Sequence, residues 1–289
     1  ETFNAKVVLN ASGIGAAEIC RMLIDEPIFE VTPRRGEYYV ISNDEHIVNN
    51  VIFPVPTAKG KGVLAIPTVY GNTLIGPNSE QLVDNISTAT SVDGASYLRE
   101  HITKIIKTVP LHKSIRTFAG LRPSTNSKDF IIEPLGVEHP NFINIASIES
   151  PGLASAPGIA DYVIENFVAG RLYLKENPDA VMTREKLIMV SELSEGERDK
   201  LVRENPQYAN IVCRCETISE GEIVAAIHEV CGARSVKGIK KRVRPGMGKC
   251  QGGFCEPKVV EILARELECS PIDIVQDGQH SQILEKENR

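Results

Sequence analysis

Long apolar runs are missing from this sequence. No segment approaches the roughly 20 apolar residues that a helix needs to cross a bilayer, and the opening ETFNAKVVLN has no basic region followed by a hydrophobic stretch. Internal repeats and low-complexity segments are also absent. We therefore expect a cytoplasmic protein without membrane insertion, whose only contact with a membrane would be peripheral and through a partner.

An excess of positive charge is missing as well. The formal net charge is -6 and the sequence pI is about 5.6, so nothing attracts the whole chain to nucleic acid or to an anionic membrane surface. We expect no nucleic-acid partner. The length of 289 residues and the hydrophobic share of 42% are enough for a buried core and for more than one domain.

The cysteines form the clearest pattern in the chain. Four of the seven lie near the C-terminus as C-R-C, 34 intervening residues, and C-Q-G-G-F-C, namely Cys213, Cys215, Cys250 and Cys255. In a reducing compartment such paired spacing predicts metal ligation instead of disulfides. Four thiolates suit an iron-sulfur cluster or zinc, although a C-x-C pair is a less usual zinc arrangement. We expect the remaining three, Cys20, Cys231 and Cys269, to be buried structural thiols in helices.

Cations cluster between the two cysteine pairs. The interval from Arg234 to Lys249 holds Lys237, Lys240, Lys241, Arg242 and Arg244 and no acidic residue. Such charges, together with the N-terminus of a helix beginning near Phe254, would stabilise a negatively charged thiolate cluster. The alternative is a solvated or nucleic-acid-binding face, but no aromatic residues interleave with the cations as base stacking would favour.

Periodicity predicts an α+β chain. A strand, a tight turn and a helix open it, and short β-type runs from Val31 to about Pro77 predict an antiparallel sheet with a hairpin at Gly71-Asn72. An amphipathic helix follows Ser91 and runs to Val109. Further expected elements are strands at 115–121, 129–134 and 142–150, and helices at 153–168, 194–205, from Ser219 to Gly232, and at 254–267.

Two resemblances to known families follow from these motifs. VCRCE with RPGMGKCQGGFC resembles the bacterioferritin-associated-ferredoxin-like [2Fe-2S] domain, over about residues 209 to 272. The resemblance implies that the four paired cysteines are the ligands of a [2Fe-2S] cluster.

The first 170 residues resemble the later part of the FAD-dependent D-amino-acid oxidase and glycerol-3-phosphate dehydrogenase superfamily. VVLNASGIGA, FAGLRPST and INIASIESPGLASAP carry this similarity. It implies that Arg122 binds an anionic substrate group, which fits the cost of placing an arginine near a core without an anion; a structural ion pair is the alternative. It also implies FAD contacts from these residues: Ala11, Ser12, Gly13, Ser150, Pro151, Gly152 and Leu153. Tyr39 and Tyr70 are further candidates for the substrate pocket, with ordinary sheet packing as the alternative.

A G-x-G-x-x-G fingerprint does not follow any N-terminal strand here. The resemblance therefore implies the C-terminal portion of a longer enzyme, which alone would be inactive, would bind FAD poorly and could self-associate through an uncovered sheet edge. The domains that we expect are a partial FAD-binding α/β domain at 1–30 and 123–172, an antiparallel substrate domain at 31–122, a linker at 173–208, a small mainly helical [2Fe-2S]-binding domain at 209–272 and a tail at 273–289.

The resemblance further implies the reaction. We expect an FAD-dependent dehydrogenase that oxidises glycerol 3-phosphate and sends electrons through the cluster to a partner subunit or a quinone-linked chain. A 2-hydroxy acid or an amino acid as substrate is the competing interpretation, and a zinc-dependent docking module is an alternative of another class. None of the six histidines lies in a motif typical of a catalytic base, so we assign no catalytic base.

Overall fold

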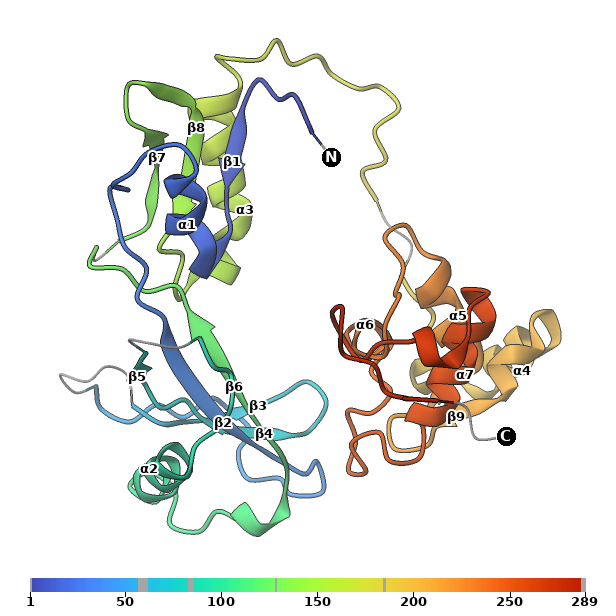
Figure 1. The fold of residues 1–289 in the computed structure, drawn as a ribbon. Helices are drawn as coiled ribbons and strands as arrows, with labels where there is room; N and C mark the ends of the chain where they lie inside the picture. Colours follow the sequence, from blue (N-terminus) through green and yellow to red (C-terminus); the bar gives the residue numbers. More distant parts are fainter. Residues whose placement is uncertain (1, 57–61, 83–85, 128, 184–185, 287–289) are drawn as a thin grey trace. The chain divides into compact units, whose positions relative to one another are not determined.

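The computed structural model describes residues 2–56, 62–82, 86–127, 129–183 and 186–286. It divides into two compact units, Glu1–Ala180 and Val181–Arg289 (Figure 1). The first unit holds two cores, each centred on one sheet, and the second unit holds a single core of its own. The exact residues at which the sequence places the domain boundaries stay predictions.

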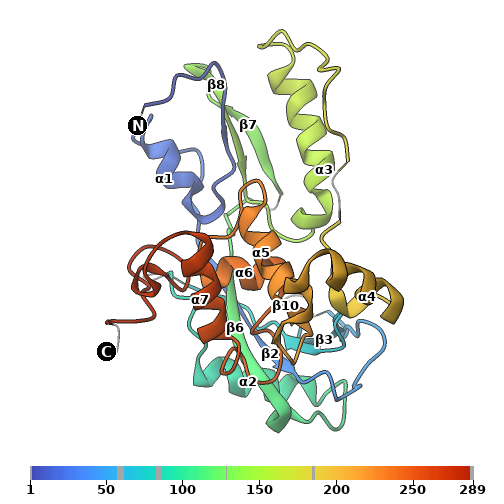
Figure 2. The ribbon, with the colours of Figure 1, turned by 90° about the vertical axis from the view of Figure 1, so that its right-hand side faces the viewer.

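The first sheet of the N-terminal unit carries the segments that resemble a flavin-binding domain. Strand β1 (Val8–Asn10) pairs in parallel with β8 (His139–Ala146), and β8 pairs antiparallel with β7 (Ile131–Leu135). Figure 2 shows α1 (Ala16–Arg21) and α3 (Gly152–Val163) on opposite sides of this sheet. A 3-10 turn, Gly13–Gly15, precedes α1, and a π-helical turn, Ile164–Val168, extends α3. The predicted strand, turn and helix at the start of the chain are confirmed.

The second sheet is antiparallel, as predicted. Its central strand β2 (Arg34–Ile41) pairs with three others, and β3 pairs with β4 in the predicted hairpin around Gly71-Asn72. The other strands are β3 (Leu64–Pro67), β4 (Thr73–Gly76), β5 (Glu80–Gln81) and β6 (Ser114–Arg122). Helix α2 (Val92–Ile102) covers one face, where Leu98 and Ile102 pack with Ile41 and Ile75.

A buried carboxylate fixes α2 against this sheet. Glu37 of β2 is 2% exposed, and its oxygens accept hydrogen bonds from the backbone N–H and the hydroxyl of Ser91, the N-cap residue. Asn78 accepts a bond from the Glu37 backbone N–H in turn. Since an ionised group is stable in a core only when hydrogen-bonded or paired, this network holds the helix in one position.

The C-terminal unit is mainly helical. Its helices are α4 (Glu195–Glu204), α5 (Glu220–His228), α6 (Val236–Val243) and α7 (Glu256–Glu266), and β9 (Ile211–Cys213) pairs with β10 (Ile218–Ser219). Capping boxes form at Ser194 and Ser219, the residues at which the sequence predicted these two helices to start. The predicted fold class is confirmed: an antiparallel sheet, a partial α/β layer and a small helical unit.

Several predicted boundaries are wrong. Among the β-type runs predicted between Val31 and Pro77, the run at 51–55 forms no strand; only Ile52 makes a bridge, to Ala65. The helix predicted to reach Val109 ends at Ile102, beyond which the chain turns while Ile105, Ile106 and Val109 still pack on the core. Helix α5 ends at His228 and not at Gly232, and α6 was not predicted at all.

The prediction for the three remaining cysteines is correct for one of them. Cys20 is buried in α1, but Cys231 is exposed with a left-handed φ of 58°, and Cys269 is half-buried after the end of α7. Helical spacing in the sequence thus did not establish burial, because α5 and α7 both end before reaching these residues.

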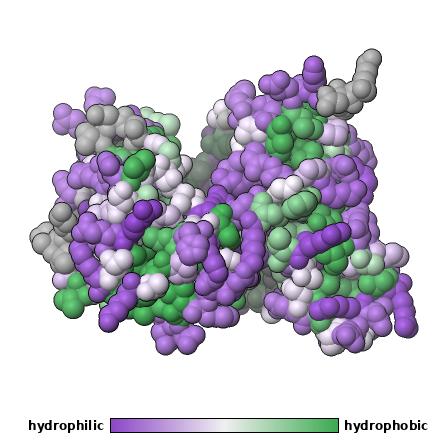
Figure 3. Space-filling view, turned by 90° about the horizontal axis from the view of Figure 1, so that it is seen from below, coloured by the Kyte–Doolittle hydropathy of each residue, from purple (hydrophilic) through white to green (hydrophobic). Residues whose placement is uncertain are grey.

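No helix in the described ranges is long and apolar enough to cross a membrane. On the face drawn in Figure 3, apolar areas interrupt a mostly hydrophilic surface in each unit. Exposed apolar side chains in the C-terminal unit include Val230 at 97% and Phe254 at 87%.

Candidate redox centre and substrate cavity

The four paired cysteines come together in the C-terminal unit. Cys213 ends β9, Cys215 follows in the turn to β10, and Cys250 and Cys255 bound the loop that leads into α7. The sulfur atoms of Cys215 and Cys250 lie 3.8 Å apart, and Cys255 shares a hydrogen bond with Cys213. Each contact therefore joins one cysteine of the first pair to one of the second.

These contacts suit a two-metal centre. Two thiolates bound to one tetrahedral metal atom at about 2.3 Å lie about 3.8 Å apart, which matches the Cys215–Cys250 separation. Among the described residues, no three His, Cys, Asp or Glu side chains converge on a point that could hold a single ion. Two close sulfur pairs fit the ligand set of a [2Fe-2S] cluster, in which each iron takes two cysteines.

Backbone N–H groups surround the sulfurs. The pKa of Cys213 is lowered to about 6, mainly by a hydrogen bond from the Cys255 thiol, whose effect exceeds the opposing effect of burial. The N–H groups of Gly246, Glu216 and Cys215 also point at Cys213 and lower its pKa further. Burial raises the pKa of Cys250, but the N–H groups of Phe254 and Gly252 outweigh it and hold that pKa below its ordinary value. Such donors stabilise thiolates and the negative charge of a cluster.

The basic interval contributes less to the centre than the sequence suggested. Lys237 pairs with Asp277 at 2.5 Å, and Arg244 pairs with Glu216 at 2.9 Å. Arg242 donates to the carbonyls of Gly238 and Cys231. Lys237, Arg242 and Arg244 are thus engaged with neighbouring groups, and backbone amides provide the positive setting at the sulfurs.

A glycine makes room for the cysteine pair. A Cβ atom built on Gly248 would lie 2.3 Å from the Cβ of Cys215, closer than real atoms approach. Position 248 therefore accepts only glycine if Cys215 is to keep its place beside Cys250.

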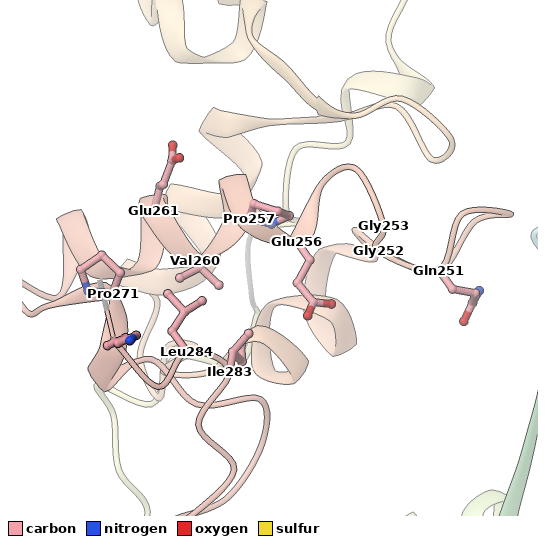
Figure 4. A pocket seen from close by; sticks show the side chains of 11 residues that line it. Gln251, Gly252, Gly253, Glu256, Pro257, Val260, Glu261, Pro271, Ile283 and Leu284 are labelled. Carbon is pink, nitrogen blue, oxygen red and sulfur yellow. The ribbon is translucent and has the colours of Figure 1, made fainter. Parts of the chain in front are cut away.

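The ligand loop also borders a cavity of about 780 Å³. Gln251, Gly252 and Gly253 form one side, and the start of α7 and the C-terminal tail form the others (Figure 4). Its floor is apolar, with Val260, Ile283 and Leu284, and in Figure 4 the Glu256 carboxylate extends away from α7 beneath Gly252.

The first flavin-like segment is a turn on a buried polar anchor. Asn10, 3% exposed at the end of β1, donates to the carbonyl of Ala16 and to the side chain of Asn144, both at 2.9 Å. Its own oxygen accepts a bond from Ser12 at 2.6 Å. Gly13 has φ +61° and no atom within 4 Å of a built Cβ, so Ala11, Ser12 and Gly13 form an open turn that a large ligand can approach.

The second flavin-like segment is a helix N-terminus without a cap. Helix α3 begins at Gly152, whose N–H donates to the carbonyl of Glu149, and no side chain caps its first turn. The dipole of this end favours an electron-rich ligand atom. Ser150, Pro151 and Leu153 are exposed around it, Leu153 at 94%. The two segments fit FAD: an open turn for its polar part and a helix N-terminus without a side-chain cap for its ring.

Arg122 lies at the end of β6 on a cavity of about 430 Å³. Its guanidinium lies against Gly36 of the neighbouring strand, where a built Cβ would approach Nη2 to 2.5 Å. Arg34, the cross-strand partner of Arg122, lines the same cavity, together with Tyr38, Glu149 and Ser150. The cavity therefore joins two cations to the segment that precedes α3.

The two tyrosines predicted for the pocket do not line this cavity. Tyr39 packs on the opposite face of β2, against the core beneath α2, and Tyr70 is half exposed in the turn after β3. Arg34 and Tyr38 were missed, although strand alternation in PRRGEYYV could have grouped Arg34, Gly36 and Tyr38 on one face. Tyr38 stacks on Phe118 of β6 with ring centroids 5.0 Å apart.

Two known families match the chain, one within each compact unit. Residues 1–166 match the family described as FAD dependent oxidoreductase, and residues 211–265 match the BFD-like [2Fe-2S] binding domain.

Named relatives share both parts. A glycerol 3-phosphate dehydrogenase of Caloramator mitchellensis is 46% identical over 98% of this chain and 59% of its own length. One subunit of the anaerobic glycerol-3-phosphate dehydrogenase of Escherichia coli (strain K12) is 22% identical over 92% of this chain and 53% of its own length. The chain spans little more than half the length of these curated relatives.

A solved structure shows the fold of the first part. The FAD-bound L-alpha-glycerophosphate oxidase of Mycoplasma pneumoniae superposes with a TM-score of 0.52 and 30% identity, over 62% of this chain and 47% of that one. The match supports the sheet arrangement described above for the N-terminal unit.

Proposed function

This chain belongs to the FAD dependent oxidoreductase family and carries a BFD-like [2Fe-2S] binding domain, and from this premise we propose that it forms part of a dehydrogenase that oxidises glycerol 3-phosphate. FAD, held by the two segments described above, would supply a hydride acceptor for the alcohol carbon, and a cluster held by Cys213, Cys215, Cys250 and Cys255 would supply one-electron transfer. The names of the relatives support this substrate class.

The observation that carries the proposal is the pair of arginines in one cavity. Arg34 and Arg122 are register partners on β2 and β6, and both line the 430 Å³ space. A phosphate dianion is a better match for two guanidinium groups than a single carboxylate, because each arginine can make two parallel hydrogen bonds. Tyr38 and Glu149 would limit the space beside the anionic group.

The proposed FAD contacts are those predicted from the sequence. Ala11, Ser12 and Gly13 would approach the nucleotide part through the open turn that Asn10 supports. Ser150, Pro151, Gly152 and Leu153 would lie at the ring, with the dipole at the N-terminus of α3 favouring its anionic reduced form. No residue is assigned as the catalytic base.

Substrate turnover tests the proposal. The flavin-loaded enzyme that contains this chain should reduce a dye with glycerol 3-phosphate far faster than with 2-hydroxyglutarate or proline. Preference for 2-hydroxyglutarate or for proline would instead establish the 2-hydroxy-acid or amino-acid alternative.

The electron acceptor is proposed to be a partner subunit or a quinone-linked chain. The relative from Escherichia coli is named as one subunit of its enzyme, which favours a partner protein. Metal analysis separates this relay from a zinc docking module: we expect two iron atoms and labile sulfide per chain, and a colourless sample loaded with zinc would reject the relay.

A further inference from the structure

The four cluster ligands differ in their exposure to solvent. Cys213 and Cys255 are 1% and 2% exposed, whereas Cys215 is exposed and Cys250 is half-buried. The latter two are also the pair in contact at 3.8 Å. One edge of the centre therefore faces the core, and the edge at Cys215 and Cys250 is where another protein can come closest.

A large aromatic side chain projects beside this edge. Phe254 is 87% exposed, although its backbone N–H points at the sulfur of Cys250. Single exposed apolar residues are common on proteins, but this one stands on the four-residue loop between two ligands. Exposed aromatic residues at the centre of a contact surface are typical anchors for a binding partner.

Cations flank the same edge. Arg214 lies between Cys213 and Cys215, Lys249 directly precedes Cys250, and both are exposed. Of the nearby carboxylates, Glu216 is paired with Arg244, and Glu256 lies against Gly252 on the side of the 780 Å³ cavity. The exposed guanidinium of Arg214 thus places a positive charge at this edge, which favours an approaching surface of negative charge.

We propose that Arg214, Cys215, Lys249, Cys250 and Phe254 form an exit surface that docks an acidic electron-carrier protein. This rests on the proposed function, because the surface has a use only if the cysteines hold a redox centre. Phe254 would anchor the carrier, and Arg214 would steer its carboxylates. Small, short-lived interfaces of this kind are usual between electron-transfer partners.

The electron count is consistent with such brief encounters. Oxidation of one alcohol to a ketone releases two electrons and two protons. Each encounter at the exit surface passes one electron to a one-electron carrier and forms or breaks no bond. Two encounters therefore discharge one turnover, and the protons go to solvent.

The test uses two haem proteins of opposite charge as probes. The full chain, loaded with its cluster and reduced by dithionite, is mixed in a stopped-flow instrument with acidic cytochrome b5 or with basic cytochrome c. Phe254→Ala should lower the second-order rate with cytochrome b5 about tenfold, with iron content unchanged. Phe254→Leu, which keeps part of the apolar contact, should give an intermediate rate.

Charge reversal gives an independent reading. Arg214→Glu should slow cytochrome b5, speed cytochrome c and shift the salt dependence of the two rates in opposite directions. The matched controls are Val230→Ala, which removes an apolar side chain that is 97% exposed, and Arg203→Glu on the exposed side of α4. Neither control should change the rates.

Binding without turnover completes the test. Oxidised cytochrome b5 should bind the oxidised wild-type chain by calorimetry and bind Phe254→Ala more weakly. Unchanged rates and affinities in all three variants would reject the proposal of an exit surface. A Phe254→Ala variant that slows only electron transfer from the flavin to the cluster would also reject it. A wild-type chain without reversible reduction would instead reject the proposed function.

Discussion

Gly36 and Arg122 form a close contact across two neighbouring strands. The guanidinium of Arg122 lies so near the backbone of Gly36 that a Cβ atom there would be 2.5 Å from Nη2 and 2.9 Å from Nη1. The absence of a side chain at position 36 therefore decides where the charge of Arg122 lies. Tyr38, two residues along the same strand, then shares the cavity with it.

Gly36→Ala should displace this charge without unfolding the unit. The new methyl group meets only the far end of a flexible side chain, so we expect little change in the midpoint of thermal unfolding. The KM for glycerol 3-phosphate should rise about tenfold in the flavin-loaded enzyme, since one charge-assisted hydrogen bond is worth about 1.5 kcal/mol or more. An unchanged KM would contradict the assigned position of the Arg122 guanidinium in the substrate cavity.

Removing either arginine of the cavity, Arg34 or Arg122, should weaken substrate binding more than flavin binding. Arg122→Ala and Arg34→Ala should each raise KM about tenfold to a hundredfold, because each removes a charged donor worth about 1.5 to 3 kcal/mol. Bound flavin, measured by absorbance, should not change. The control is Arg116→Ala, which removes an exposed arginine on the same strand β6. Equal effects of all three substitutions on KM would reject a specific role of Arg34 and Arg122 in substrate binding.

Gly248→Ala should reduce the iron content of the C-terminal unit. A methyl group at this position overlaps the Cβ of Cys215, which would have to move away from Cys250. We expect at least half of the visible absorbance of the reconstituted cluster to be lost. Gly278→Ala, where no atom lies within 4 Å of the added carbon, is the control and should keep the full iron content. A normal iron content in Gly248→Ala as well would show that the loop tolerates the displacement of Cys215.

Much of this chain could be predicted from its sequence because the patterns are local. The capping boxes at Ser194 and Ser219 and the hairpin at Gly71-Asn72 depend on a few adjacent residues. The cysteine spacing indicated two loops meeting at one centre. What spacing could not give was the partner of each sulfur, because Cys213 contacts Cys255 and Cys215 contacts Cys250 only through the folding of the whole unit.

The face of β2 was not predictable for a similar reason. Alternation separates Arg34, Gly36 and Tyr38 from Arg35, Glu37 and Tyr39, but each set holds an arginine and a tyrosine. The choice is made by distant residues: Phe118 stacks on Tyr38, and α2 covers the side of Tyr39. Local periodicity contains neither contact.

Helix α6 was missed because its apolar stripe is narrow. Val236, Ile239 and Val243 are buried, but the cations between them dominate the sequence of this segment. A period of three to four residues in only three apolar positions gives a weak helical signal. The short length of eight residues makes the packing of the unit, and not helix propensity, the source of its stability.

The stability of the C-terminal unit should depend on pH through Glu222. Burial raises the pKa of this carboxyl above its ordinary value, against the opposing effect of hydrogen bonds from Ser219 and Val190. The folded state thus keeps a proton that the unfolded chain has already released, so the contribution of Glu222 is complete below the ordinary glutamate pKa and is lost as pH rises through the raised value.

Glu222→Gln should remove this dependence, because an amide does not ionise. The free energies of unfolding in urea of the wild type and the variant should be most alike at low pH, where Glu222 is protonated. The wild type should then lose stability relative to the variant as pH rises, by about 1.4 kcal/mol for each unit of pKa shift. Glu195→Gln, an exposed residue at the start of α4, controls for the loss of one carboxylate. A wild type that gains stability relative to the variant as pH rises would contradict the raised pKa.

The most direct test of the account is a potentiometric titration of the reconstituted chain followed by electron paramagnetic resonance. We predict two iron atoms per chain and a single reversible one-electron reduction that produces the signal of a reduced [2Fe-2S] cluster, and Cys250→Ser should alter or abolish this signal. A chain that binds zinc in preference to iron, or that shows no reversible one-electron step, would contradict the account.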